Sequence, residues 1–135
     1  RPMAKIASGG EISRIMLAFK HIIGSSDSVE TMIFDEIDTG ISGRAAQVVG
    51  EKLAEMSKYK QLICITHLPQ IAAFADDHYY IEKNVENERT FTSISNLDYE
   101  DREKEIARLI SGKIITEKTL EHSHEMIELA KKTKA

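Results

Sequence analysis

The sequence predicts an α/β domain in which parallel strands are flanked by helices and followed by a small β-hairpin. Two short apolar runs, TMIF and QLICIT, have the composition of strands, and a helical pattern separates them. A strand–helix–strand order implies a parallel pair joined by a right-handed crossover. With 135 residues, 41% hydrophobic and 30% charged, residues 1–135 suit a single domain with a real core.

Composition excludes several classes of protein. The net charge of -4 argues against electrostatic binding of nucleic acid by the chain as a whole. Any DNA contact would therefore be local or lie in another part of the protein. No apolar run approaches the length needed to cross a bilayer. We expect no signal peptide, and the single cysteine, Cys64, lies inside an apolar run, which favours a reduced cytosolic compartment. Because the chain opens on Arg1-Pro2, we expect it to be a piece of a longer protein.

The first predicted element is an amphipathic helix that ends near Gly24. Its apolar residues recur at helical spacing at Ile12, Ile15, Met16, Phe19, Ile22 and Ile23. Its entrance, Ser8 to Glu11, places a hydroxyl and glycine amides at the positive end of a helix, where phosphate oxygens bind well. Ser8 and Glu11 also have the spacing of a capping box, and taken alone this simpler interpretation is the better one.

A polar loop, Gly24 to Glu30, leads to the first strand. The apolar run from Met32 to Phe34 passes directly into Asp35 and Glu36, followed by a turn. This pattern predicts a buried strand whose carboxyl end opens into a site, since ligands bind at that end in open α/β sheets. One carboxylate could bind a cation while the other orients a water molecule. Alternatively, the two acids could merely solubilise the strand end.

The second strand is predicted at Gln61 to Thr66, after a helix that starts at Ser42 or Gly43. The apolar positions expected for that helix are Ala45, Val48, Val49, Leu53 and Met56. The strand ends in His67, and Pro69 then opens another helix. Because parallel strands bring their carboxyl ends together, His67 should share one edge with the acids and could donate to a phosphate oxygen. A lone histidine after a strand is more often structural.

The last part of the chain predicts a hairpin and two helices. The strands are expected at His78–Asn84 and Thr90–Leu97, around the loop VENER, and the helices at Glu100–Ser111 and Thr116–Lys132. His122 and His124 are two residues apart on a helix and point to different faces, so we reject them as a metal pair. The run from Asp76 to His78 is read as a turn rather than a cation site.

A nucleotide-binding loop is missing from the sequence. A P-loop requires G-x-x-x-x-G-K-[ST], and the only Gly-Lys pair, Gly112-Lys113, has neither the earlier glycine nor the following hydroxyl. The chain therefore offers acids, a histidine and an anion-binding helix start, but not the loop that would hold a nucleotide. It has the features of half a site.

Three segments together resemble a known family. ASGGEISR, TMIFDEIDTGISG and CITHLPQIAAFAD, in this order and spacing, resemble the carboxyl-terminal part of the ATPase head in the RecN family of bacterial DNA repair proteins, relatives of the SMC proteins within the ABC ATPases. The resemblance runs from about Lys5 through Asp76, and EIARLISG and TEKTLEHS extend it. Ala7 stands where the ABC signature commonly has leucine, which RecN-like sequences also accept.

The resemblance implies a three-layer P-loop-NTPase fold of the ABC/SMC head type that lacks its Walker A half, and it implies ATP and Mg²⁺ as cofactors. The implied site residues are Asp35 for Mg²⁺, Glu36 as the general base, His67 as the switch histidine, Asp38 in the D-loop, and Ser8, Gly9, Gly10 and Glu11 as the signature motif. In the family, the signature touches the γ-phosphate of nucleotide held by the opposite head.

The implied partners are the amino-terminal half of the same head, a second head in a homodimer, and DNA through the full-length protein, in the nucleoid of a bacterial cytoplasm and without a membrane. ATP hydrolysis would belong to the full-length protein, and this chain alone is expected to be inactive. Two alternatives remain open. Asp35, Glu36, Asp38 and His67 could form a self-contained metal-dependent phosphohydrolase site, or the domain could be a noncatalytic interaction module.

Overall fold

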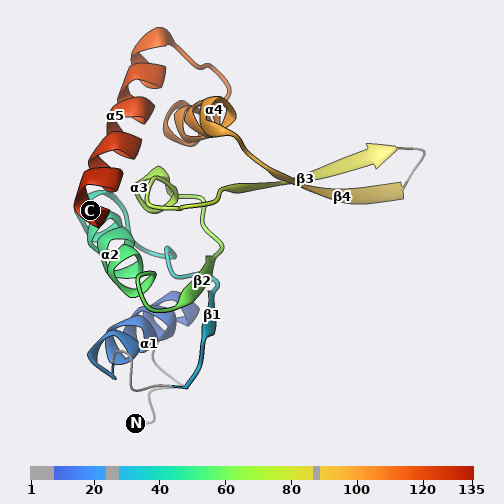
Figure 1. The fold of residues 1–135 in the computed structure, drawn as a ribbon. Helices are drawn as coiled ribbons and strands as arrows, with labels where there is room; N and C mark the ends of the chain where they lie inside the picture. Colours follow the sequence, from blue (N-terminus) through green and yellow to red (C-terminus); the bar gives the residue numbers. More distant parts are fainter. Residues whose placement is uncertain (1–7, 24–27, 87–88) are drawn as a thin grey trace.

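The computed structural model describes residues 8–23, 28–86 and 89–135 (Figure 1). The elements are α1 (Gly9–Ile23), β1 (Thr31–Phe34), α2 (Gly43–Met56), β2 (Gln61–Cys64), α3 (Pro69–Ala72), β3 (Tyr79–Glu86), β4 (Arg89–Asn96), α4 (Tyr99–Ser111) and α5 (Glu117–Lys134). Ala7 at the head of the motif, the start of the loop at 24–30 and the tip of the hairpin at 87–88 lie outside the described residues.

The predicted parallel pair is confirmed. β1 and β2 lie side by side with Thr31 opposite Gln61 and Phe34 opposite Cys64, and α2 forms the crossover between them. β2 is shorter than the predicted Gln61–Thr66, although the Ile65 amide still donates to the Phe34 carbonyl at 2.9 Å. The strand ends there because the Thr66 hydroxyl and the His67 amide donate instead to Asp38, in the loop that follows β1.

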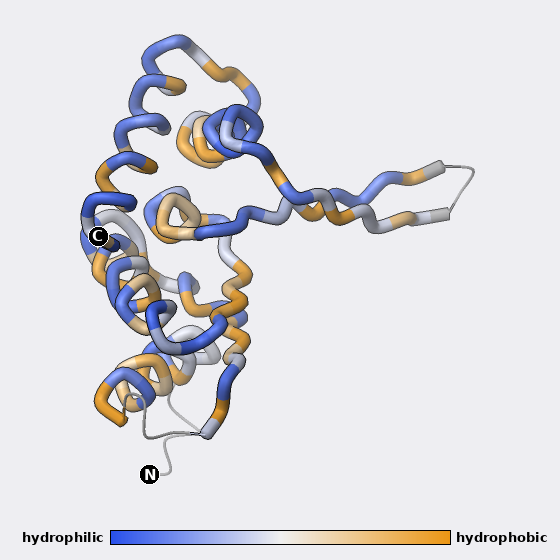
Figure 2. Tube along the Cα trace, viewed as in Figure 1, coloured by the Kyte–Doolittle hydropathy of each residue, from blue (hydrophilic) through white to orange (hydrophobic). Residues whose placement is uncertain are grey.

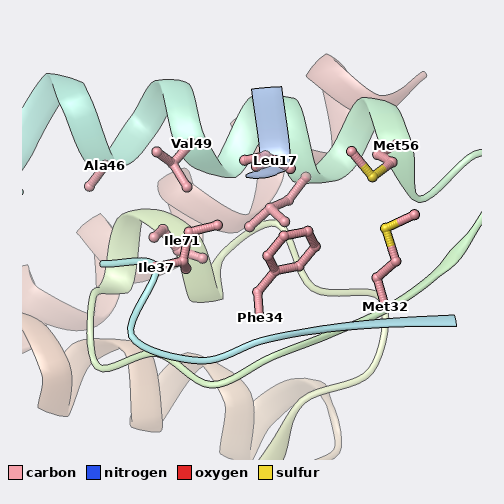
Figure 3. Packing of buried hydrophobic residues seen from close by; sticks show 9 residues of the cluster. Leu17, Met32, Phe34, Ile37, Ala46, Val49, Met56 and Ile71 are labelled. Carbon is pink, nitrogen blue, oxygen red and sulfur yellow. The ribbon is translucent and has the colours of Figure 1, made fainter. Parts of the chain in front are cut away.

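The core lies on one face of this sheet. Met32 and Phe34 point from β1 toward α2, and Leu17 of α1 reaches the same cluster (Figure 3). The opposite face carries Ile33, Ile63 and Ile65, all of them exposed. The first strand was predicted to be buried, and this is confirmed only for its face toward the helices, because the helices of the described residues cover only one side of the sheet. The expected three-layer arrangement would need a further layer on the exposed face of the sheet, which residues 8–23, 28–86 and 89–135 do not supply.

The buried face of α2 confirms Val49, Leu53 and Met56 among the predicted positions but not Ala45 and Val48. Its buried residues are Ala46, Val49, Gly50, Leu53, Ala54 and Met56, whereas Ala45 and Val48 are exposed. The helix is rotated toward Gly50 because α3 and Phe74 pack there closely. A Cβ added to Gly50 would come within 2.6 Å of Cδ2 of Phe74.

The orientation of α1 is the largest departure from the prediction. Gly10 and Leu17 are its buried residues, and the predicted apolar positions are mostly exposed. Ile22, for example, is 82% exposed. Figure 2 shows these hydrophobic residues at the end of the molecule where α1 lies. The helix exists where the spacing predicted it, but its apolar side does not face the core of this chain.

The carboxyl-terminal elements follow the prediction with small changes in their bounds. β3 and β4 form an antiparallel hairpin that projects from the helical body, and its strands extend into the loop predicted at VENER, with Glu86 opposite Arg89 (Figure 1). A second core packs Ile106 and Ile127 of α4 and α5 against Ala72, Ala73 and Phe74. Among the described residues, no helix has the length and apolar character to cross a membrane.

Candidate functional site

Asp38, in the turn after β1, hydrogen-bonds to the residues that follow β2. Its side chain is only 4% exposed, and its Oδ2 accepts hydrogen bonds from the Thr66 hydroxyl at 2.7 Å and from the His67 amide at 2.9 Å. The ring Nδ1 of His67 lies 3.0 Å from the same oxygen. The carboxylate therefore fixes the position of the segment that follows β2.

The pKa of Asp38 reflects these contacts. Burial by itself raises this pKa, but the hydrogen bonds from Thr66 and the His67 amide, together with the charge of the His67 ring, outweigh burial and hold it below its usual value. Asp38 is thus a buried carboxylate kept ionised by its partners. The role that the family implies for it, at a dimer interface, remains a prediction, and the contacts described here support a positioning role.

The His67 ring contacts Asp38 through Nδ1, and most of the side chain is exposed. Its side chain is 74% exposed, and Nδ1 faces Asp38, so the proton of a neutral ring belongs on that nitrogen. Nε2 is then the nitrogen left for a ligand. To donate a hydrogen bond to a phosphate oxygen from Nε2 as well, the ring must be the imidazolium, whose charge Asp38 balances.

Glu36 adopts a backbone conformation that is unusual for a residue with a side chain. Its φ is 57°, in the left-handed region, and its carbonyl accepts the Thr39 amide at 3.1 Å to close a tight turn. Its own amide donates to Oδ1 of Asp35 at 2.9 Å. Such strain costs about 1–3 kcal/mol and is found most often at functional positions. Sequence alone gives no sign of it.

The two glycines at the start of α1 lie against this turn. A Cβ at Gly9 would come within 2.5 Å of Oε2 of Glu36, and one at Gly10 within 2.7 Å of the Glu36 carbonyl oxygen. Only glycine permits this approach without a shift of the turn. The Glu36 carboxylate consequently lies at the positive end of α1, where a negative charge is favoured.

Ser8 and Glu11 form the capping box that was the simpler interpretation. The Ser8 amide donates to Oε2 of Glu11 at 2.8 Å, and the Glu11 amide donates to the Ser8 hydroxyl at 3.3 Å. This interpretation is confirmed. The Ser8 hydroxyl would have to give up its cap contact, or share it, to bind a phosphate.

Two further residues bind α1 to the turn, and the sequence argument did not identify them. The Ser13 hydroxyl donates to the Asp35 carbonyl at 3.0 Å. The Arg14 guanidinium donates to the carbonyls of Ile37 and Thr39 at 3.0 and 2.8 Å. In the sequence they lie on the polar side of an amphipathic helix, a position that by itself predicts contact with solvent and not with a partner.

The residues fit Mg²⁺ only in part. The ion accepts one or two carboxylates together with water and substrate oxygens, and the exposed carboxylate of Asp35 at a strand end satisfies that need. Within the described ranges, no three His, Cys, Asp or Glu side chains gather closely enough to hold a metal ion. The alternative of a self-contained metal-dependent phosphohydrolase and the rejection of His122 and His124 as a metal pair both stay predictions.

Comparison with known proteins gives a consistent result. The chain is 51% identical to a "DNA repair protein RecN" of Halalkalibacterium halodurans, over 96% of the chain, 46% identical to that of Bacillus subtilis over 99%, and 48% identical to that of Treponema pallidum over 94%. In each case the chain spans 22% or 23% of the relative's length. No protein-family model matches the chain.

Proposed function

Because the chain belongs by sequence to the RecN family of DNA repair proteins, we propose that it is the carboxyl-terminal lobe of an ATPase head. In this proposal the full-length protein acts in ATP-dependent repair of DNA double-strand breaks and in recombination. Its ATP site is composite, and this chain supplies the signature motif, the acidic strand end, the loop that follows it and the switch histidine.

One observation carries the proposal. The turn from Asp35 to Thr39 contacts the start of α1 through Ser13 and Arg14, and contacts the end of β2 through Asp38. The three segments that carry the family resemblance therefore meet at one edge of the sheet. Phosphoryl transfer depends on positioning and on charge neutralisation, which is what such a junction can provide.

The residues have separate tasks in this proposal. Asp35 would hold Mg²⁺, which neutralises charge on the phosphates when it is bound. Glu36, whose carboxylate the left-handed turn holds beside the glycines, would orient the attacking water as general base. His67 would donate from Nε2 to the γ-phosphate, and Asp38 would hold its ring in place.

The proposed partners complete the site. The amino-terminal half of the same head would provide the Walker A loop that the 135 residues lack. The glycine amides of a second head in a homodimer would reach the γ-phosphate, so that ATP controls closure of the two heads and, through the full-length protein, engagement of DNA. The chain by itself is accordingly expected not to hydrolyse ATP.

Substitution of the general base tests the proposal. In the full-length protein, Glu36→Gln keeps the size and backbone of the side chain but cannot accept the proton of the attacking water. We expect ATP to bind and its hydrolysis to fall by about 10²-fold or more. Single-turnover hydrolysis and analytical ultracentrifugation should then show ATP-bound dimers that persist.

The control is Glu51→Gln on α2, because Glu51 contacts Gln47 within its own helix and lies outside the junction. This variant should hydrolyse ATP at the parental rate. Dimers of the Glu36→Gln protein that separate as fast as those of the parent, with ATP turnover intact, would exclude Glu36 as the base.

A further inference from the structure

We propose that Arg14 is a positioning residue for ATP hydrolysis, which holds the Glu36 carboxylate in place through the backbone of the turn after β1. The inference rests on the proposed function, because it concerns the residue that acts there as general base. It gives a task to a side chain of α1 that lies outside the predicted site.

The backbone carbonyls of the turn are the groups that Arg14 binds. One nitrogen of its guanidinium, Nη1, donates to the carbonyl oxygen of Ile37 at 3.0 Å and to that of Thr39 at 2.8 Å. Nη1 carries two N–H groups, so both hydrogen bonds can form at once. Because the donor is charged, these hydrogen bonds are stronger than those between neutral groups. Arg14 therefore binds the backbone of the turn firmly at two points.

The turn needs support from outside because its backbone at Glu36 is strained. The φ of Glu36 is 57°, and a left-handed residue with a side chain persists only where its surroundings hold it. Inside the turn, the Glu36 carbonyl accepts the Thr39 amide at 3.1 Å. Arg14 binds the carbonyl of the same Thr39, and so fixes the end of the turn that closes on Glu36.

Arg14 and the glycines at the start of α1 contact the turn from one side of the helix. Gly10 and Arg14 are four residues apart, which makes them neighbours on the surface of a helix. A Cβ at Gly10 would come within 2.7 Å of the Glu36 carbonyl oxygen, and one at Gly9 within 2.5 Å of Glu36 Oε2. The backbone of α1 thus lies against Glu36, and Arg14 sets the spacing between this backbone and the turn. Loss of Arg14 should let the turn relax and displace the carboxylate.

Glu36 lies between two points at which side chains of α1 bind the turn. Before it, the Ser13 hydroxyl donates to the Asp35 carbonyl at 3.0 Å. After it, Arg14 binds the two carbonyls described above. Ser13 contributes one neutral hydrogen bond, whereas Arg14 contributes two that are charge-assisted. A misplacement of about 1 Å at a reacting group can cost about 10²-fold in rate, so we expect Arg14 to be the more important anchor for the base.

ATP hydrolysis by full-length variants, measured in the steady state and in single turnovers, tests the inference. Arg14→Met keeps the length and helix propensity of the side chain but removes its donors. Because the base acts in the chemical step and not in binding, kcat should fall by about 10- to 100-fold, while KM for ATP changes by less than about twofold. Arg14→Lys should keep kcat within about threefold of the parent, because one charged nitrogen makes both contacts and Lys supplies such a nitrogen.

The control is Arg108→Met on α4, where Arg108 pairs with Glu105 of the same helix. Helix α4 lies at the opposite end of the molecule from α1 (Figure 1), so this variant should hydrolyse ATP at the parental rate. The double variant Arg14→Met/Glu36→Gln should be no slower than Glu36→Gln alone, because Arg14 acts through Glu36.

The inference would be overturned by an Arg14→Met protein with the parental kcat, by a raised KM with kcat unchanged, or by a further loss of rate in the double variant. An Arg14→Lys protein as slow as Arg14→Met would also contradict it. So would loss of the helical circular dichroism of Arg14→Met, since this would show a role in the stability of the whole head. If Glu36→Gln is inactive and Arg14→Met is not impaired, the inference alone fails. A fully active Glu36→Gln protein would instead refute Glu36 as the base, and the inference with it.

Discussion

At the scale of single residues, Asp38 connects the two halves of the site. Three donors, from Thr66, the His67 amide and the His67 ring, converge on one oxygen of a buried carboxylate. Hydrogen bonds to an ionised group contribute about 1.5–3 kcal/mol, and more is lost when one buried partner is left unpaired. The position of His67 therefore depends on a residue that the sequence marks only as part of a turn.

The substitution Asp38→Asn tests this dependence. The amide keeps the shape of the side chain but removes the charge and half of the acceptor capacity, so one of the donors loses its partner. We expect the chain to be destabilised by about 2–4 kcal/mol in chemical denaturation. The control Asp77→Asn, at an exposed position, should change stability by less than about 0.5 kcal/mol.

The same pair of proteins should show a dependence on pH. Because the folded-state pKa of Asp38 is lowered, its contribution is complete above the unfolded-state value of about 4 and is lost as the pH falls through the lower folded value. The difference in unfolding free energy between parent and Asp38→Asn should shrink below about pH 4. A difference that stays constant from neutral to acidic pH would contradict the assignment.

Cys64 provides a second test at this scale. Burial, with a further effect of the charges on Asp38 and Asp35, raises the pKa of the Cys64 thiol to about 12. Since the thiolate is the nucleophile, alkylation by iodoacetamide at neutral pH should be about a thousandfold slower than for an ordinary thiol. Cysteine placed at exposed Glu121 is the control. Equal labelling rates at the two positions would contradict the raised pKa of the Cys64 thiol.

At the scale of elements, hydrophobic periodicity predicted where the helices lie and part of the buried face of α2, but not which side of α1 faces inward. The bounds of α1 and α2 agree with the spacing of their apolar residues to within a residue or so. Their faces were set by tertiary contacts that periodicity does not contain. Arg14 turned α1 toward the carbonyls of the acidic turn, and the close approach of Phe74 to Gly50 rotated α2.

The contact at Gly50 predicts an unusual response to alanine. Alanine favours a helix over glycine by about 1 kcal/mol, so Gly50→Ala would stabilise an unpacked helix. Here the added methyl group meets the Phe74 ring and the Gln70 carbonyl, and we expect a net loss of about 1–3 kcal/mol. Chemical denaturation measures the change, and Val48→Ala, on the exposed side of α2, is the control. A more stable Gly50→Ala protein would show that α2 and α3 are farther apart.

At the scale of the whole molecule, the order of motifs was readable from the sequence because each is a local pattern. A parallel pair then had to bring Asp35, Glu36 and His67 to one edge, and it does. The left-handed turn at Glu36, the burial of Asp38 and the contact of Gly10 with Thr39 were not readable, since they depend on residues more than twenty positions apart or on backbone angles.

At the same scale, the start of α1 can serve the ATP site in one of two arrangements. In this chain the glycines lie beside Glu36 of the same chain, whereas the proposed function has them serve nucleotide in a second head. The two arrangements differ in one respect. In the second, each complete site takes its signature from one protomer and its acids from the other.

Mixing two inactive full-length variants distinguishes a site built within one protomer from a site shared between two protomers. Ser8→Arg alters the signature together with the cap that Ser8 provides for α1, and Glu36→Gln removes the base, so each homodimer should be inactive in ATP hydrolysis. A heterodimer assembled across the interface has one site with both defects and one site with none. Half of the dimers in an equal mixture are heterodimers with one intact site of two, so we expect about a quarter of the parental ATPase rate. Activity that stays at the level of the separate variants would mean that both motifs act within one protomer, and would contradict the composite site.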